Sequence, residues 1–112
     1  MTENDFRKLA LSFPEAEEKL HMGHPDFRVG GKIFATLGHA KGRAVAMLTP
    51  DLQEVFVHAA PDVFEPVSGG WGHGGATTID LKICRKAIAR DALAAAWRRR
   101  APKRLSRDLD AG

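Results

Sequence analysis

The five histidines are the residues of this sequence best suited to hold a metal ion. His21 and His24 are three positions apart. Gly23 and Pro25 place this pair at a strand end and a turn, where such spacing does not direct both rings at one ion. The other three are expected at a hairpin tip, on a helix and in a glycine-rich loop: His39, His58 and His73. Because a metal site needs several converging ligands, we predict solvent-exposed histidines and no metal site.

The sequence also contains no clear signal for a catalytic site that uses a nucleophile or an acid–base pair. Cys84 is the single cysteine, so no internal disulfide can form. Its place between a strand and a helix predicts a buried, small apolar residue rather than a nucleophile. No serine or cysteine has a recognisable base beside it, and no two carboxylates have a forced common geometry. We therefore predict that the protein is not an enzyme and carries no cofactor.

Residues 69–75 read GGWGHGG and, from Gly70, satisfy the dinucleotide-binding pattern G-x-G-x-x-G. That pattern binds a pyrophosphate only where a strand precedes it and a helix follows, because the helix N-terminus receives the phosphates. Here a proline-broken loop (60–68) precedes the glycines, and an alternating, β-branched run (76–83) follows them. There is no Gly-Lys-Ser/Thr phosphate loop either. We interpret the glycines as permitting a tight loop around Trp71.

Two glycine turns are each flanked by basic residues, Arg28 with Lys32 and Lys41 with Arg43. Two adjacent basic hairpin loops can act as wings that lay Lys and Arg against phosphates. Trp71, on its glycine-rich loop, could stack on a base or fill a groove. The alternative is that the charges at these turns are simply solvated and that Trp71 covers the sheet.

The net charge of +3 is unevenly distributed. Residues 1–81 contain 7 Lys and Arg against 11 Asp and Glu, a balance of −4, whereas residues 82–112 contain 10 against 3, a balance of +7. Much of that excess lies in one run, at Arg98–Arg100, Lys103 and Arg104. Such asymmetry favours either a polyanionic partner or a solvated helix face.

Helices are expected at both ends of the chain. Thr2 and Asp5 resemble a capping box, and the apolar residues that follow share one helical face until Pro14. Thr49-Pro50 predicts the start of a second helix, which ends near Pro61. The last helix is expected over 85–101, with Leu93 and Trp97 against the sheet, and Pro102 ends it.

The middle of the chain predicts antiparallel strands at 17–22, 26–29, 32–37, 43–48 and 76–82. Gly30-Gly31 joins two alternating runs, as a tight hairpin turn requires positive φ at both central positions. The predicted fold is therefore α+β, with the helices on one face of an antiparallel sheet.

The length of 112 residues fits one domain, which we place at 1–105 with a frayed, flexible tail at 106–112. No apolar run approaches the roughly 20 residues that cross a bilayer, and the N-terminal residues lack the features of a signal peptide. We expect a cytoplasmic protein without membrane association and favour a monomer.

Three stretches resemble the MmcQ/YjbR family of small bacterial proteins: GHPDFRVGGKIFATL at 23–37, GGWG at 69–72 and AWRRRAPKRL at 96–105. The resemblance covers residues 4 to 105. It implies a frataxin-like (CyaY-like) α+β fold, with two terminal helices packed on one antiparallel sheet, and DNA binding through a double wing without catalytic residues. Applied to this sequence, the resemblance places the two wings at the hairpins of residues 28–32 and 36–43. The sequence departs at Arg85-Lys86, where the family implies acidic residues, so its terminal helix is more basic.

Two functions follow from these patterns. The first is weak, sequence-tolerant DNA binding by Arg28, Lys32, Lys41, Arg43, Trp71, Arg98, Lys103 and Arg104. The second is a small-ligand or protein-interaction module with a pocket lined by His24, Lys32, Trp71 and Thr78. Frataxin-style iron binding would need an acidic first helix; this one offers only Glu3 and Asp5, so we set that function aside.

Overall fold

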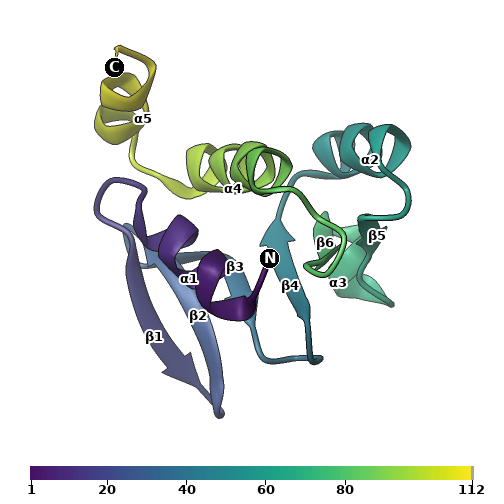
Figure 1. The fold of residues 1–112 in the computed structure, drawn as a ribbon. Helices are drawn as coiled ribbons and strands as arrows, with labels where there is room; N and C mark the ends of the chain where they lie inside the picture. Colours follow the sequence, from purple (N-terminus) through teal and green to yellow (C-terminus); the bar gives the residue numbers. More distant parts are fainter. Residues whose placement is uncertain (112) are drawn as a thin grey trace.

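The computed structural model describes the backbone of residues 1–111 and the side chains of residues 1–107 (Figure 1). The elements follow one another in the order α1 (Glu3–Leu11), β1 (Glu17–His21), β2 (His24–Val29), β3 (Lys32–Leu37), β4 (Arg43–Met47), α2 (Pro50–Ala59), β5 (Phe64–Pro66), α3 (Gly70–His73), β6 (Ala76–Asp80), α4 (Lys86–Arg100) and α5 (Lys103–Ala111). Among the described residues, no helix is long and apolar enough to cross a membrane.

The six strands form one sheet in the order β1-β2-β3-β4-β6-β5, and every neighbouring pair is antiparallel. The first four strands are a meander, and β6 then enters between β4 and β5. The predicted α+β fold with an antiparallel sheet is confirmed. The prediction of a loop over 60–68 was wrong in part, because β5 occupies residues 64–66 at the sheet edge. An edge strand tolerates Pro66, and Phe64 is buried opposite Ile79.

Local sequence signals explain where several elements begin. The Thr2 side chain accepts a hydrogen bond from the Asp5 backbone, and the Asp5 carboxylate accepts one from the Thr2 backbone, so the capping box is present. The Thr49 hydroxyl accepts from the Leu52 backbone at the start of α2. Gly30 and Gly31 both have positive φ, at 58° and 77°, as the tight turn between β2 and β3 requires.

The helices α1, α2 and α4 cover one face of the sheet (Figure 1). Trp97 of α4 is fully buried there and lies 6.1 Å from the Phe13 ring in a stacked arrangement. Leu93 is also fully buried, so the predicted orientation of the terminal helix is confirmed. The core is formed by these side chains and the inward residues of the strands, among them Phe27, Ala35, Leu37, Ala46 and Ile79.

The other face of the sheet carries no long helix. Because side chains alternate along a strand, the residues between the core positions point to this second face. Strand pairing aligns Asp26 with Thr36 and Thr36 with Val45 across it, and Val45 with Thr78. The short helix α3, which follows the edge strand β5, contacts β6. This second face therefore holds polar side chains at its centre.

A further helix follows α4 near the end of the described residues. After Pro102 the chain forms α5, whose first turn is fixed by hydrogen bonds from the Leu105 and Ser106 backbones to the Pro102 carbonyl. Leu105 is buried in the core, 4% exposed, and this tertiary contact was not visible in the polar sequence. The segment expected to fray from residue 106 is helical as far as Ala111, and Gly112 lies outside the described residues.

Candidate functional site

The two basic turns lie at opposite ends of β3 (Figure 1). Gly30-Gly31 connects β2 to β3 at one end, and residues 38–42 connect β3 to β4 at the other. A meander reverses direction at every turn, so consecutive turns cannot share an end. The expectation that the two loops are adjacent was therefore wrong, and the structure does not bring Lys32 and Lys41 together.

Both arginines of the expected wings are engaged with carboxylates. The Arg28 guanidinium donates from Nε to Asp26 Oδ1 at 2.9 Å and from Nη2 to Asp26 Oδ2 at 3.0 Å. This hydrogen bonding to Asp26 raises the pKa of Arg28. Arg43 Nη1 donates to Asp80 Oδ1 at 3.1 Å across the β4–β6 pair. Lys32 and Lys41 are exposed.

The first turn meets the C-terminal segment of the chain. A Cβ placed on Gly30 would lie 3.1 Å from Pro102 Cδ, so the turn is in contact with the junction between α4 and α5. Lys32 follows this turn directly and is exposed, and a run of cations surrounds Pro102 in the sequence. We call the resulting surface the basic end, and define it as Lys32, Arg98, Arg99, Arg100, Lys103 and Arg104.

Two neighbouring arginines concentrate charge in the basic end. Arg99 Nη1 donates to the carbonyls of Met47 and Leu48, at 3.2 and 3.0 Å. Burial lowers the pKa of Arg99, and the nearby Arg100 guanidinium lowers it further. The buried Arg100 Nε has no hydrogen-bond partner among the described residues. An anion near these two guanidinium groups would offset the repulsion.

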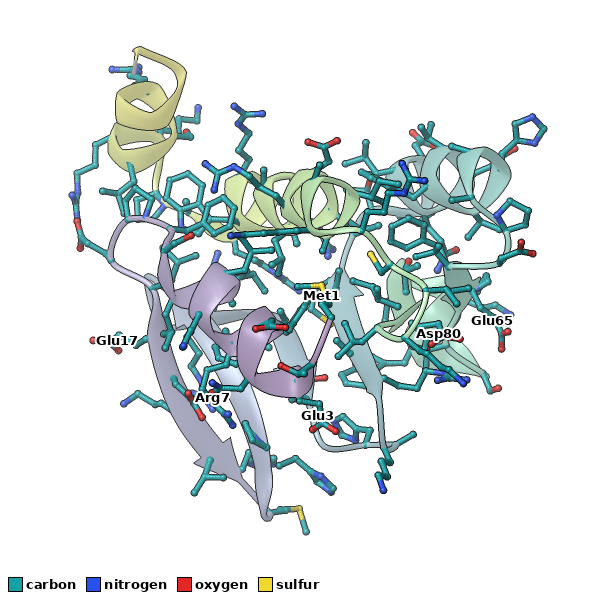
Figure 2. All side chains as sticks on the ribbon, viewed as in Figure 1. Met1, Glu3, Arg7, Glu17, Glu65 and Asp80 are labelled. Atoms are coloured by element: carbon teal, nitrogen blue, oxygen red, sulfur yellow. The ribbon has the colours of Figure 1, made fainter. Side chains whose placement is uncertain are left out.

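Acidic residues offset only part of this charge. Arg104 donates to the two carboxylate oxygens of Glu15 at 3.0 and 3.4 Å, and this pair is largely exposed. Exposed pairs of this kind contribute little to stability and exchange readily with other anions. In Figure 2 the labelled acids Glu3, Glu65 and Asp80 lie away from α5, whereas Glu17 pairs with Arg28 near the Gly30-Gly31 turn. The basic end thus keeps a positive character.

The glycine-rich segment forms a single helical turn, α3, rather than an open loop. A Cβ on Gly72 would collide with the Val67 carbonyl, and one on Gly75 with the Leu48 carbonyl. Gly75 also has a φ of +112°, so the interpretation that these glycines serve backbone geometry is supported by both contacts. Strand β6 follows immediately, so the helix that a dinucleotide site needs after the motif is not there.

Beneath α3 the second face of the sheet is hollowed into a cavity of about 170 Å³. We call it the sheet-face pocket. Its principal lining residues are His24, Asp26, Ile33, Thr36, His39 and Trp71. Of the ligand pocket expected from the sequence, His24 and Trp71 line this cavity. Lys32 does not, and Thr78 lines a smaller neighbouring cavity.

Three aromatic rings form one wall of the sheet-face pocket. The His24 and His39 rings stack with centroids 4.5 Å apart, and the Trp71 ring meets His39 edge-on at 5.8 Å. His24 Nδ1 lies 3.0 Å from the Gly38 carbonyl, which can only accept, so this nitrogen carries the proton. Burial lowers the pKa of His39, and the neighbouring His24 adds to the shift.

Sequence reasoning missed this meeting of two histidines. It treated each as a separate solvated side chain, although the β2–β3 register aligns Asp26 with Thr36 and so brings the ends of the two strands together. Extending the register of the predicted hairpin to its far end could have shown that the two histidines meet. Trp71, assigned to the DNA-binding set, lies over this pocket and away from the basic end.

The described residues contain no group of three His, Cys, Asp or Glu side chains that could hold a metal ion. Cys84 is buried, and burial raises the pKa of its thiol, which therefore stays protonated near neutral pH. The predicted reading of Cys84 as a buried apolar residue is consistent with this environment.

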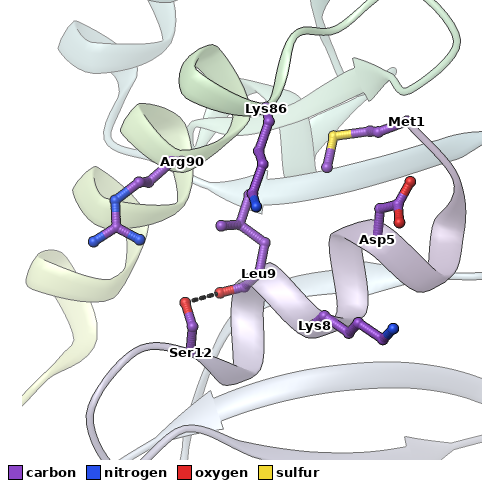
Figure 3. Close-up of a pocket in the computed structure, with 7 residues that line it drawn as sticks. All are labelled: Met1, Asp5, Lys8, Leu9, Ser12, Lys86 and Arg90. Carbon is purple, nitrogen blue, oxygen red and sulfur yellow. Dashed lines mark hydrogen bonds between the residues drawn. The ribbon is translucent and has the colours of Figure 1, made fainter.

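A further cavity of about 460 Å³ lies between α1 and the first turns of α4 (Figure 3). Its lining carries charges of both signs, with Asp5 and Lys8 on α1 facing Lys86 and Arg90 on α4. The Arg90 guanidinium lies 5.4 Å from the centre of the Phe13 ring and Asp5 is used by the capping box. Arg90 is thus partly committed to the Phe13 ring, and Asp5 to the start of α1.

The antiparallel sheet, with long helices on one face and a cavity on the other, defines a small α+β protein. The family model described as YjbR matches residues 11–99, and the chain belongs to the YjbR family, as its resemblance implied. In structure it is similar to the Deinococcus radiodurans protein DR2400, whose crystal structure is described with the family-model domain DUF419. That likeness has a TM-score of 0.68 at 17% identity and covers 97% of this chain and 88% of the other. A comparison with curated proteins gave no match.

Proposed function

We propose that this protein binds DNA weakly and with little sequence preference, through phosphate contacts at the basic end. The observation that carries the proposal is the contact between Gly30 and Pro102. It joins a basic hairpin to a basic helix junction that lies far away in the sequence. We infer that the cations of both segments form one surface that can follow a phosphate backbone.

The local electrostatics of this surface favour an anion. Burial lowers the pKa of Arg99, and the nearby positive charge of Arg100 lowers it further. Charge-assisted hydrogen bonds from arginine to phosphate are strong and frequently bidentate. A phosphate seated near these two arginines would offset that repulsion.

The residue types of the basic end support contacts to the backbone rather than to bases. The basic end is defined by Arg and Lys residues, and the side chains that read adenine bidentately, Asn4 and Gln53, lie elsewhere, in α1 and α2. Phosphate contacts position a protein on DNA without carrying sequence information. We therefore expect binding that is nearly uniform across sequences.

The double wing that the resemblance implies is reduced in this proposal to one wing and a helix junction. The hairpin of Lys41 lies at the other end of β3, and Arg43 is engaged with Asp80. A duplex bound at the basic end would not contact both hairpin turns at once, as the double wing requires. Lys41 thus becomes a matched control for Lys32, since both are exposed lysines beside glycine turns.

The test is a fluorescence-anisotropy titration of a labelled, random-sequence duplex at several salt concentrations. Lys32→Ala and Arg100→Ala should each weaken binding evenly across sequences and lower the salt slope by about one unit. Lys41→Ala should leave affinity and slope unchanged. No association at low salt, or an equal loss in Lys41→Ala, would contradict the proposal.

We further propose that this role is non-catalytic and that it is carried out in the cytoplasm by a monomer. The buried, protonated Cys84 offers no nucleophile, in keeping with a binding role. Sedimentation of the purified protein with and without the duplex would test the monomer.

A further inference from the structure

The cavity between α1 and the first turns of α4 is lined by cations from both helices (Figure 3). We call it the interhelix site; Lys8 of α1 and Lys86 and Arg90 of α4 supply its positive charges. The only carboxylate among its described lining residues is Asp5, which accepts a hydrogen bond from the Thr2 backbone. Three cations against one carboxylate give the lining side chains a net charge of +2. The interhelix site therefore favours an anion that carries two charges.

The two cations of α4 have no protein partner that offsets their charge. Neither Lys86 nor Arg90 forms an ion pair with a described carboxylate. Like charges four residues apart on one helix repel each other. Lys86 also lies in the first turn of α4, which contains no acidic residue and where the helix dipole disfavours a cation. This arrangement is unfavourable in the protein alone, and an anion bound between the two helices would offset the repulsion.

The positions of these two side chains suit one shared ligand. In Figure 3 the Lys86 side chain extends from α4 toward Leu9 of α1, so its ammonium group lies between the two helices. The Arg90 guanidinium lies one turn further along α4, toward the Ser12 end of the cavity, with its centre 5.4 Å from that of the Phe13 ring. Contact with the face of a ring leaves the N–H donors at the edge of a guanidinium able to bind an oxygen.

The interhelix site has room for more than an inorganic anion. Its volume of about 460 Å³ lies within the range of several hundred Å³ that is typical of sites for small organic ligands. Leu9 and Met1 add apolar surface to the lining beside the charged groups. An organic group attached to the anion would cover that surface and remove it from water. The cavity thus fits a ligand with an anionic head and a compact organic body.

We propose that the interhelix site binds a small organic phosphate monoester. Near neutral pH a monoester carries close to two negative charges and presents three acceptor oxygens, which matches both the net charge of the lining and its three cations. The inference goes beyond the proposed DNA binding, in which each phosphate within a strand is a diester with one charge. It also concerns another surface, because Arg98 of the basic end lies roughly 18 Å further along α4 than Lys86.

Phenyl phosphate is the ligand for a direct test, and phenyl sulfate is its matched control. The two share a ring and a tetrahedral anion, but the sulfate ester has one charge. In proton–nitrogen NMR spectra at about pH 7.5, phenyl phosphate should shift the backbone resonances of Lys86 and Arg90 saturably. Phenyl sulfate should bind about fivefold more weakly, because it lacks one charge–charge interaction. Equal binding of the two esters, or no saturable shift with phenyl phosphate, overturns the proposal.

Two lysine variants test whether the cavity or the general positive charge attracts the ligand. Lys86→Gln removes a cation from the lining and should weaken the binding of phenyl phosphate about five- to tenfold. Lys82→Gln removes an exposed lysine just before α4 that does not line the cavity, and it should bind as the unchanged protein does. Both side chains are exposed, and circular dichroism checks that both variants fold. Equal losses in the two variants would contradict a defined site.

Inorganic phosphate and duplex DNA complete the experiment. Inorganic phosphate cannot cover the apolar surface and should bind more weakly than phenyl phosphate; equal affinity would contradict an organic ligand. Lys86→Gln should leave the affinity for the duplex unchanged, and Lys32→Ala should leave the binding of phenyl phosphate unchanged. A protein that binds phenyl phosphate but no duplex contradicts the proposed function alone, and the reverse result contradicts the interhelix site alone.

Discussion

The Nε1 of Trp97 donates a hydrogen bond to the Pro14 carbonyl over a distance of 3.1 Å, and so ties α4 to the connection between α1 and β1. Trp97 is fully buried, and its ring stacks on Phe13. One side chain thereby joins both terminal parts of the domain to the sheet.

Replacing this side chain should therefore have a large effect on stability. Trp97→Ala empties a large aromatic site and should lower the free energy of unfolding by about 3–5 kcal/mol. Trp97→Phe keeps much of the packing and should lose less, because the main change is one hydrogen bond and part of the ring. Urea denaturation followed by circular dichroism measures both values. Equal stability of the two variants would show that packing around Trp97 is not the dominant contribution.

Two buried threonines on opposite faces of the sheet should respond in opposite directions to the same change. Thr36→Val removes a hydroxyl without a partner among the described residues and should raise the free energy of unfolding, by about 1 kcal/mol. Thr77→Val removes a hydroxyl that donates to the Gly75 carbonyl at 2.8 Å and should lower it by about 1–2 kcal/mol. Chemical denaturation measures the free energy of unfolding of both variants. A loss of stability in Thr36→Val would mean that its hydroxyl is satisfied in solution.

The glycines of α3 should differ sharply in their tolerance of alanine. A Cβ on Gly72 meets the Val67 backbone, which cannot move aside cheaply, so Gly72→Ala should lower the free energy of unfolding by about 3 kcal/mol or more. Gly70 has no atom within 4 Å of such a Cβ, and Gly70→Ala should be neutral or stabilising. Thermal unfolding compares them under the same conditions. Similar melting temperatures would contradict the close approach of α3 to residue 67.

The stacked histidines should make the sheet-face pocket sensitive to pH. Burial, and then the charge of His24, lower the pKa of His39 from its ordinary value of 6.5. The unfolded chain then binds a proton more readily than the folded one. The contribution of His39 to the free energy of unfolding is therefore full above about pH 6.5, and it is lost as the pH falls toward the lowered pKa. The titration of the His39 ring protons by NMR should give a midpoint below 6.5.

A matched variant separates this effect from the titration of other groups. His39→Gln keeps a polar side chain at the pocket and cannot be protonated in this range. The loss of stability between about pH 7.5 and about pH 5.5 should therefore be smaller in His39→Gln than in the unchanged protein. An identical pH dependence in the two proteins would show that His39 does not contribute.

Local signals allowed much of the fold to be predicted from the sequence. The Thr2–Asp5 capping box, the proline after Thr49 and the Gly30-Gly31 turn each act within a few residues, and each lies where it was expected. The burial of Leu93 and Trp97 followed from helical periodicity, which is also a local property. These features made the order of helices and strands readable without any knowledge of long-range contacts.

The features that were missed depend on contacts between distant segments. Strand β5 is paired only because β6 lies beside it, and α5 begins where Leu105 reaches the core. The basic end depends on Gly30 meeting Pro102, and the sheet-face pocket on His24 meeting His39. None of these pairings has a signature in the residues immediately around it. Charge and aromatic patterns therefore identified suitable residue types, but not which of them share a surface.

The insertion of β6 between β4 and β5 has a consequence for the order in which the chain can fold. Strands β1 to β4 are joined by short turns, so this meander closes only small loops and can pair early. The free edge of β4 is covered only when residues 76–80 arrive, after the whole segment of α2, β5 and α3 has been made. On the ribosome, the nascent meander therefore exposes an unpaired edge until β6 emerges, and an apolar face that is incompletely covered until α4 emerges. That interval is when a partly made chain is most exposed to pairing with the wrong strand.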